Sequence, residues 1–291
     1  MKKKLLAVLL ALFLVACALY AAYSLGLFEN APDDPVGDTY VDFIDCGQGD
    51  SILIVSEGQS VLIDATTGKN EDDVTEHLQK RGITKIDHFV LTHSHEDHIG
   101  GADAVLDQFE VGAVYMKKPP VGKEPTTKVY LNLLKQIKSL GKKVTSTETG
   151  MTFECGSVKF EVLGPLKDYE ETNDQSVILR GTVGDVSFLF TGDQEIAAEE
   201  DLVARFGSKL DSTVLKVGHH GSEGSSSEEF LEQVSPEYAV IQCGEDNSYG
   251  HPHREALERL EDFDVQCYRT DLSGTVTITT DGKKITVTEE K

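Results

Sequence analysis

Cysteine is scarce in this sequence, and its spacing argues against a metal site built from thiolates. The 291 residues include five cysteines, of which Cys17 lies in an apolar N-terminal run. The other four are scattered without a C-x-x-C pair: Cys46, Cys155, Cys243 and Cys267. An oxidising compartment would allow three disulfide pairings among four cysteines. Buried free thiols explain the same residues equally well, so no pairing is predicted.

Basic residues are also few, which bears on the ligands that the protein attracts. Lysine and arginine total 27 against 50 acidic residues, for a formal net charge of −23. Residues 1–30 carry three lysines and one glutamate, so the remainder has a net charge of −25. A field of this sign repels nucleic acid at long range. It does not exclude a local basic channel, and four lysines cluster in one segment: Lys117, Lys118, Lys123 and Lys128.

A long apolar run occurs once, at the N-terminus. Three lysines precede 24 uncharged and mostly apolar residues, Leu5 to Phe28, which is enough to span a bilayer. Lysines ahead of the run predict a cytoplasmic N-terminus and a domain outside the cell membrane. The sequence therefore predicts a membrane anchor over residues 1–28. A cleaved signal peptide and a lipoprotein modified at Cys17 are the alternatives, and all three export the rest of the chain.

After a predicted linker at residues 29–38, strand and helix patterns alternate. The linker holds two prolines and four acidic residues. Strand patterns occur in "TYVDFID", "SILIVS", "SVLID" and "IDHFVLT", and later in "VKFEVLG", "SVILRGTV", "VSFLFTG", "STVLKVG" and "YAVIQCG". Residues 71–82 and 126–141 have helical spacing, and the second segment places Val129, Leu133, Ile137 and Leu140 on one face. "TVTITTDGKKITVT" is typical of a hairpin with an Asp-Gly turn. This interleaving predicts an α/β domain over residues 39–291, with mixed sheets and helices outside.

The densest polar cluster is "VLTHSHEDHIGG", residues 90–101, which uses three of the nine histidines. Imidazole and carboxylate groups suit zinc, and also manganese or iron where carboxylates share the site. Side chains two apart on an extended segment point the same way, so His93 and His95 are predicted to hold one ion. Asp97 and His98, on the following turn, are predicted to reach a second ion.

This H-x-H-x-D-H arrangement resembles the signature of the metallo-β-lactamase-fold hydrolases. That family has an aspartate ending an earlier strand, an aspartate after a later strand and a further histidine. "VLID", "FLFTGD" and "LKVGHHGS" supply these in order: Asp64, Asp193, and His219 with His220. The resemblance implies an αββα four-layer sandwich with two mixed β-sheets, and a pair of divalent metal ions.

Between His98 and Asp193 many members of the family place another histidine, and this sequence has none there. The comparable stretch is "ETNDQSVIL", with Asn173, Asp174 and Ser176. With "DCGQGDS" (residues 45–51), "KVGHHGS" and "YGHPH", it resembles the exported hydrolase domain of ComEC-type DNA-uptake proteins. The sequence also resembles bacterial phosphorylcholine esterases. The multispan channel of ComEC-type proteins is not in this sequence, so a role in DNA transport does not carry over.

The resemblance implies a role for each residue. Asp193 bridges two ions, and the metal ligands are His93, His95, Asp97, His98, Asp193 and His219. Three further residues either bind a metal or orient a ligand: His220, Asp64 and Asp174. His220 is the alternative to His219. Candidates near the cleft that are not expected to be ligands are Gln48, Asp50 and Ser51.

The catalytic candidates are Asp97, His251 and Asn173. With two histidines, the first ion has an open position for water, Asn173 or substrate. Asp97 or Asp193 is suited to hold the nucleophile's proton, and His251 to donate a proton or bind a phosphate oxygen. The substrate-binding candidates are Ser176, His253 and Tyr249. His253 also fits the start of a helix, because Pro252 suits a first turn.

Such a site predicts hydrolysis, because two metal ions activate water and hold the oxygens of the displaced group. The sequence predicts an exported phosphoesterase that uses zinc, with manganese second, and a nuclease-like phosphodiester substrate. Choline phosphate or another small phosphoester, a β-lactam and a lactone are alternative substrates. An alternative from another functional class is a non-catalytic binding protein of the cell envelope, which would explain why no histidine lies between His98 and Asp193. No protein partner is predicted.

Overall fold

The computed structural model describes residues 39–291, the span of the predicted hydrolase domain. The predicted membrane anchor (1–28) and linker (29–38) lie outside the described residues. Within residues 39–291, no helix combines the length and the apolar composition needed to cross a membrane. The anchor therefore stays a prediction from the sequence.

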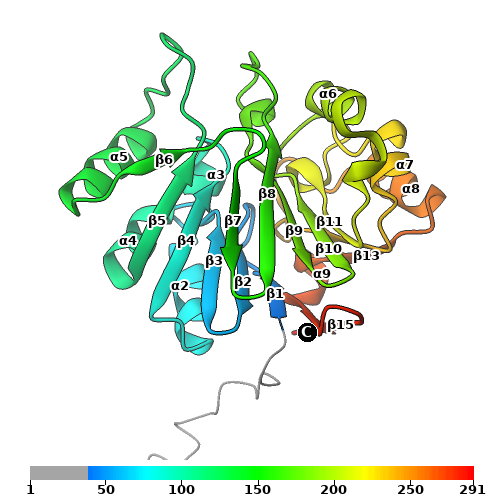
Figure 1. Cartoon of the computed structure of the whole chain (residues 1–291), viewed down its shortest axis with the longest axis horizontal. Helices are drawn as coiled ribbons and strands as arrows, with labels where there is room; N and C mark the ends of the chain where they lie inside the picture. The colour runs from blue at the N-terminus through cyan, green and yellow to red at the C-terminus, as the bar shows by residue number, and fades with distance from the viewer. Residues whose placement is uncertain (1–38) are drawn as a thin grey trace, which may run out of the picture. The chain divides into compact units, whose positions relative to one another are not determined.

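The first sheet joins the N-terminal strands to the C-terminal hairpin. Its eight strands are β1 (Thr39–Phe43), β2 (Ile52–Ser56), β3 (Gln59–Ile63), β4 (Lys85–Leu91), β5 (Glu110–Met116), β6 (Val144–Ser146), β14 (Val276–Thr280) and β15 (Ile285–Glu289). They lie in the order β15-β14-β1-β2-β3-β4-β5-β6 (Figure 1). The strands β3 to β6 are parallel and the other pairs antiparallel, so the sheet is mixed.

The second sheet comes from the later part of the chain. Its seven strands are β7 (Thr152–Cys155), β8 (Val158–Gly164), β9 (Ile178–Val183), β10 (Val186–Phe190), β11 (Val214–Lys216), β12 (Tyr238–Ile241) and β13 (Gln266–Arg269). Their order is β13-β12-β11-β10-β9-β8-β7, with β10 to β13 parallel. Both sheets are mixed, as the sequence predicts.

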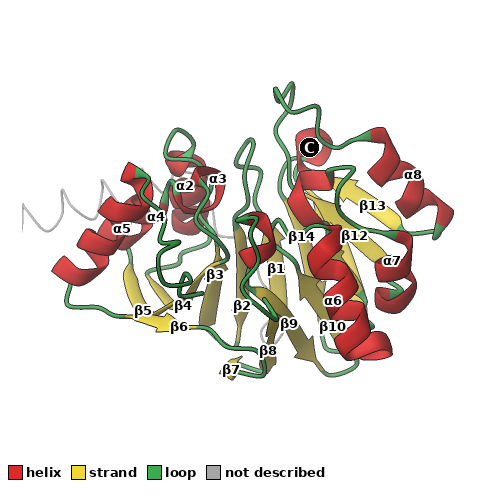
Figure 2. Ribbon diagram, turned by 90° about the horizontal axis from the view of Figure 1, so that it is seen from above, coloured by secondary structure: helices red, strands yellow, loops and turns green. Residues whose placement is uncertain are grey.

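Helices cover the outer faces of the two sheets (Figure 2). They are α2 (Glu71–Lys80), α3 (Glu96–Ile99), α4 (Ala102–Gln108), α5 (Lys128–Ser139), α6 (Ile196–Phe206), α7 (Glu228–Val234), α8 (Arg254–Asp262) and α9 (Thr270–Ser273). The inner faces of the sheets meet in an apolar core that includes Phe43, Phe160, Phe188 and Phe190. One further apolar cluster lies between each sheet and its helices. The layers are those of an αββα sandwich, which confirms the predicted fold.

Helix α5 shows how the local sequence sets an element. Thr127 caps its N-terminus by accepting a hydrogen bond from the backbone N–H of Tyr130. The buried residues of the helix recur at three- and four-residue spacing: Tyr130, Leu133 and Ile137. The sequence predicts an apolar face with Val129 and Leu140 at its ends, but Leu140 is 45% exposed. The buried face therefore begins at Tyr130 and ends at Ile137.

The four cysteines among the described residues are free thiols. Cys46, Cys155 and Cys243 are buried, and Cys267 is partly buried. Of the two explanations that the sequence allows, the structure therefore shows free thiols.

Candidate metal centre

The predicted ligands come together at the strand ends where the two sheets meet. His93 and His95 follow β4, and His98 lies in the short helix α3. Asp193 follows β10 of the other sheet, and its Oδ2 lies 3.1 Å from Nε2 of His98. The carboxyl ends of parallel strands are where α/β folds bind ligands. The polar loops that follow strands of both sheets therefore meet at the same edge of the sandwich.

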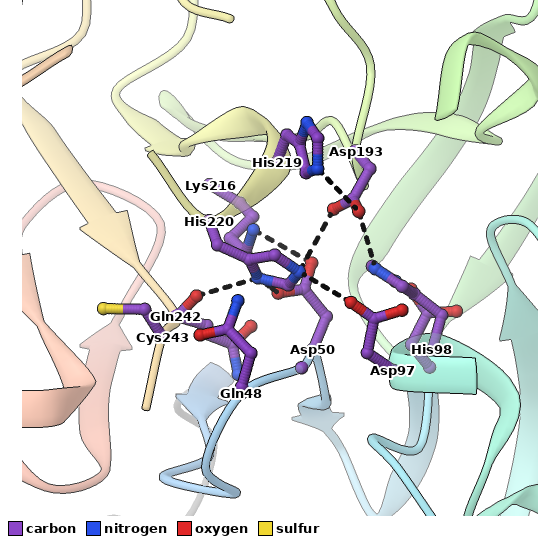
Figure 3. Close-up of polar contacts among 12 residues, drawn as sticks. Gln48, Asp50, Asp97, His98, Asp193, Lys216, His219, His220, Gln242 and Cys243 are labelled. Atoms are coloured by element: carbon purple, nitrogen blue, oxygen red, sulfur yellow. Dashed lines mark hydrogen bonds and ion pairs between the residues drawn. The ribbon is translucent and has the colours of Figure 1, made fainter. Parts of the chain in front are cut away.

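One group of donor atoms is enclosed. It consists of Asp97, His98, Asp193 and His220, whose ligand atoms lie within 4.8 Å of one another. Nε2 of His220 lies 3.3 Å from Oδ2 of Asp97 and 3.6 Å from Oδ1 of Asp193 (Figure 3). Three of the four residues are buried. Two imidazoles and two carboxylates form a donor set that suits a divalent transition metal.

A second group is more open and shares one residue with the first. It consists of His93, His95 and Asp193. Nε2 of His93 lies 3.1 Å from Nδ1 of His95 and 3.8 Å from Oδ2 of Asp193. His93 is buried, whereas His95 is exposed. Because Asp193 belongs to both groups, its carboxylate is positioned to bridge two ions.

The buried atoms at this point fit metal ligation. Oδ1 of Asp193 is buried and has no hydrogen-bond partner among the described residues. Nε2 of His98 is also buried without a hydrogen bond there, and its contact is the 3.1 Å ion pair with Oδ2 of Asp193. Buried polar atoms without a partner are costly, and a divalent cation at their meeting point would remove that cost. The residues present therefore fit a dimetal site.

Asp64 fixes the orientation of His98. Its Oδ2 accepts a hydrogen bond from Nδ1 of His98 at 2.8 Å, so Nε2 faces the metal group. Thr92 holds Asp64 in turn, through its backbone N–H at 2.7 Å and its hydroxyl at 2.6 Å. A carboxylate behind a ligand histidine fixes its tautomer and raises its basicity. The geometry therefore suits Asp64 to orient a ligand.

The two adjacent histidines diverge, and His220 rather than His219 lies in the enclosed group. Both have left-handed φ angles, 45° and 54°, which turn their side chains apart. Nδ1 of His220 donates to the carbonyl of Gln242 at 2.9 Å, leaving Nε2 free for a metal. Nδ1 of His219 instead lies 2.9 Å from Oε1 of Glu195, and its Nε2 is 3.9 Å from Asp193. The sequence favours His219, and the structure places the alternative in that position.

A buried ion pair lies behind His220. Lys216, at the end of β11, is 1% exposed, and its Nζ is 2.9 Å from Oδ2 of Asp50. Oδ1 of Asp50 is 3.3 Å from Nδ1 of His220 (Figure 3). Sequence reasoning passed over Lys216. The available signal was a lysine inside the apolar strand segment "STVLKVG", since a lysine in a buried strand needs a charged partner.

The "DCGQGDS" loop packs directly against the metal-binding turn. The backbone N–H of Asp50 donates to the carbonyl of Asp97 at 3.1 Å. A Cβ on Gly49 would lie 2.5 Å from that carbonyl, so the close approach requires glycine. Ser51 is buried and donates to the carbonyl of Asp64 at 3.1 Å. This loop supports the ligands from behind.

The "TNDQS" stretch forms a 3-10 turn, η1 (Asn173–Gln175), beside the open group. Asn173 lines the cleft, and its buried Oδ1 has no hydrogen-bond partner among the described residues. Asp174 accepts a hydrogen bond from the backbone N–H of Glu195 at 2.9 Å and lies outside the donor groups. Ser176, a predicted substrate contact, is fully buried and instead lies 3.2 Å from Nδ1 of His93. Ser176 is therefore placed to orient His93, a predicted ligand, rather than to contact a substrate.

A cleft of about 360 Å³ opens onto the two donor groups. Its lining includes Gln48, Asp97, Asn173, Tyr249 and His251. Burial, and then the nearby His220 and His219, lower the pKa of His251 to about 4, so its ring is neutral at pH 7. Because the amide nitrogen of Gln48 lies 3.4 Å from Nδ1 of His251, Nδ1 accepts and Nε2 carries the proton.

His253 and Tyr249, also predicted to bind substrate, differ in position. His253 stands at the N-cap of α8, as the helix-start interpretation predicts. Its Nδ1 accepts a hydrogen bond from the backbone of Glu223 at 2.9 Å, and its Nε2 donates to the carbonyl of Tyr249 at 3.2 Å. Tyr249 is 65% exposed and stacks on His251. Tyr249 can reach a substrate, whereas both ring nitrogens of His253 are engaged.

The carboxylates around the enclosed group stabilise positive charge on its histidines. Burial would lower the pKa of His220, but Asp193 and Asp50 raise it to about 10. Burial would raise the pKa of Asp193, but His98 and His220 hold it well below its usual value. The carboxylates thus stabilise positive charge where His98 and His220 meet. A divalent ion bound by these residues would be stabilised by the same field.

Comparison with known proteins assigns the family. The chain matches the sequence model of the metallo-β-lactamase superfamily over residues 44–245. ComE operon protein 3 of Bacillus subtilis (strain 168) is 33% identical, covering 81% of this chain and 32% of that protein. Competence protein ComA of Neisseria gonorrhoeae is also 33% identical, covering 82% and 32%. The chain spans about a third of the length of these relatives.

Solved structures show the same fold at low sequence identity. The metallo-β-lactamase fold protein YhfI from Bacillus subtilis has a TM-score of 0.55 at 11% identity, over 84% of this chain and 100% of that one. CmlA, a diiron β-hydroxylase from Streptomyces venezuelae, has a TM-score of 0.56 at 15% identity, over 84% and 54%. The chain belongs to the metallo-β-lactamase superfamily.

Proposed function

We propose that this domain is an exported, binuclear metal-dependent phosphodiesterase with a nuclease-like substrate. The observation that carries the proposal is the Asp193 carboxylate, which is shared between two donor groups at the floor of an open cleft. Members of this superfamily are generally metal-dependent hydrolases. Export rests on the apolar run at residues 5–28 and the lysines ahead of it.

Two divalent ions, zinc first and manganese second, would supply activated water and offset charge on the phosphoryl oxygens. His98, His220 and Asp97 would hold one ion, and His93 and His95 the other, with Asp193 between them. Three of the imidazoles, those of His98, His220 and His93, are already oriented by Asp64, Gln242 and Ser176. Little reorganisation is then needed when the ions bind.

The residues of the cleft divide the remaining tasks. Asp97 is the partly exposed carboxylate of the enclosed group and accepts the proton of the attacking water. His251 is neutral, so its Nε2–H donates a hydrogen bond to a phosphoryl oxygen rather than a proton. Asn173 faces the open group and orients the substrate or the water beside His95.

The phosphodiester substrate is supported by the relatives and by the "TNDQS", "GHHGS" and "GHPH" motifs. Both relatives at 33% identity match the chain over most of its length, and ComEC-type proteins act in DNA uptake. A solved diphosphatase of the PhnP family shares the fold, with a TM-score of 0.50. The alternative of a non-catalytic binding protein rests on the two-histidine open group.

The test combines metal content with turnover. Zinc- or manganese-loaded protein is assayed on bis-p-nitrophenyl phosphate, single-stranded DNA and a chromogenic β-lactam. We expect turnover of the phosphodiesters, and loss of both activity and metal in His93→Ala. Metal binding without turnover of any substrate would favour the binding protein. Turnover of the β-lactam alone would reject the phosphodiesterase.

A further inference from the structure

A second, smaller cavity, of about 80 Å³, lies beside His93. Its walls come from the loop after β4, the segment 117–127 between β5 and α5, and the connection between β8 and β9. The last two segments rise at the same edge of the molecule (Figure 1). His93 lines this cavity and His95 lines the cleft. Their rings contact each other, so the two cavities are neighbours.

The two cavities differ in chemistry. The metal cleft is lined by carboxylates and histidines, whereas the second cavity has flat apolar walls: Tyr130, Tyr169, Pro119, Pro120 and Pro125. Its charged lining residues are Lys117 and Lys123, opposed by Glu170. Apolar and aromatic side chains beside a positively charged edge are the combination that proteins use to bind single-stranded nucleic acid.

The lysines that line this cavity belong to a positively charged segment of an otherwise acidic chain. Residues 117–128 contain four lysines and one glutamate, a local charge of +3, whereas the whole chain carries −23. Among residues 39–291, neither Lys117 nor Lys123 makes an ion pair. Their charges are therefore available to an anionic ligand.

We propose that this cavity binds the nucleotide next to the scissile phosphodiester. The base lies against the prolines and the small accessible parts of Tyr130 and Tyr169, which are 5% and 6% exposed, and its phosphate lies at Lys117 and Lys123. Contact with the flat face of a base tolerates any base, so the site recognises single-stranded nucleic acid without sequence preference. The same lysines disfavour a quaternary ammonium group, which separates this substrate class from choline phosphate. The inference rests on the proposed function and names its substrate.

Binding is measured by fluorescence anisotropy with metal-loaded full-length protein. The probe is a labelled ten-residue oligothymidylate with phosphorothioate links, which resist hydrolysis. We expect the Lys117→Ala/Lys123→Ala double variant to bind about tenfold more weakly, with a salt slope smaller by about 1. The matched control is Lys135→Ala/Lys138→Ala, which removes the same charge from exposed positions of α5. Equal weakening in both double variants would overturn the inference.

A second probe tests the base. An abasic oligonucleotide of the same length has the phosphates without the rings, so we expect it to bind at least about fivefold more weakly to the wild type. Equal affinity for the two probes would overturn the proposed base site.

Bis-p-nitrophenyl phosphate separates this inference from the proposed function. It has no neighbouring nucleotide, so its turnover should change less than about twofold in Lys117→Ala/Lys123→Ala, because the lysines do not line the metal cleft. If this substrate is hydrolysed and the loss of the two lysines leaves oligonucleotide affinity unchanged, the inference fails and the phosphodiesterase proposal stands. If the lysines govern binding but no substrate is hydrolysed, the phosphodiesterase fails and the binding site stands.

Discussion

The two donor groups share Asp193 but differ in how firmly their residues are held. In the enclosed group, a carboxylate fixes His98 and a backbone carbonyl fixes His220. In the open group, His93 contacts Ser176, but His95 is exposed and contacts His93 rather than a supporting carboxylate.

This difference suggests a division of labour. A fully oriented donor set holds an ion tightly because the protein has already ordered the ligands. A two-histidine group beside a cleft keeps positions for water and substrate. We therefore expect the enclosed group to bind its ion more tightly and the open group to exchange its ligands during turnover.

The largest effect is expected from Asp193→Ala, which removes the residue that the two donor groups share. Both ions lose a ligand, so metal content should fall below one ion per chain and phosphodiester turnover by more than about a hundredfold, the upper range for a merely supporting residue. Elemental analysis and kinetics measure the two. Asp72→Ala, at an exposed position of α2, is the control, and retention of both ions in Asp193→Ala would show that the carboxylate is no bridge.

Lys216→Met tests whether the enclosed group depends on the charge behind it. The change leaves Asp50 buried without its cation, so the free energy of unfolding should fall by about 3–5 kcal/mol. Urea denaturation in the presence of a chelator measures this without metal stabilisation. The double variant Asp50→Asn/Lys216→Met removes both charges and should recover most of the loss. Equal stability of the two variants would mean that the ion pair is not the cause.

His220→Ala and His219→Ala form a matched pair of adjacent positions. We expect His220→Ala to lose one ion and most of the activity, because its Nε2 faces Asp97 and Asp193. His219→Ala should keep both ions, with a smaller change in KM, since His219 lines the cleft. Metal content and kinetics of the two proteins provide the check, and the reverse order of effects would return the ligand role to His219.

Asp64→Asn should have the smallest effect, confined to the enclosed group. An asparagine keeps the shape but removes the charge behind His98, which should weaken binding of one ion by about 10–100-fold. Titration with a competing chelator resolves the two affinities. Equal weakening at both sites would mean that the two groups are not held independently.

Much of this fold can be predicted from the sequence, because long periodic segments leave little choice. The apolar alternation of β1 to β4 and the spacing in α2 and α5 predict those elements. The strands β5, β6, β7 and β13 were missed. β6 and β7 are short, and β13 has no fully buried residue, so their pairing depends on neighbours that the sequence does not show.

The sequence predicts the site residues where histidines and aspartates cluster. It does not predict them where backbone conformation determines which side chain faces the metals. His93, His95, Asp97, His98 and Asp193 come after strands at recognisable spacing. Adjacent histidines cannot be distinguished by spacing, and the left-handed turn at His219 and His220 decides which one faces the metals. The pairing of Lys216 with Asp50 joins residues 166 positions apart, a contact that only the packed sheets create.

The most direct test of the two-group account is a crystal structure of the metal-loaded protein with anomalous diffraction measured at the metal absorption edge. The account predicts two peaks about 3.5–4 Å apart, one among Asp97, His98 and His220 and one beside His93 and His95, with Asp193 touching both. A single peak, or a second peak away from Asp193, would contradict it.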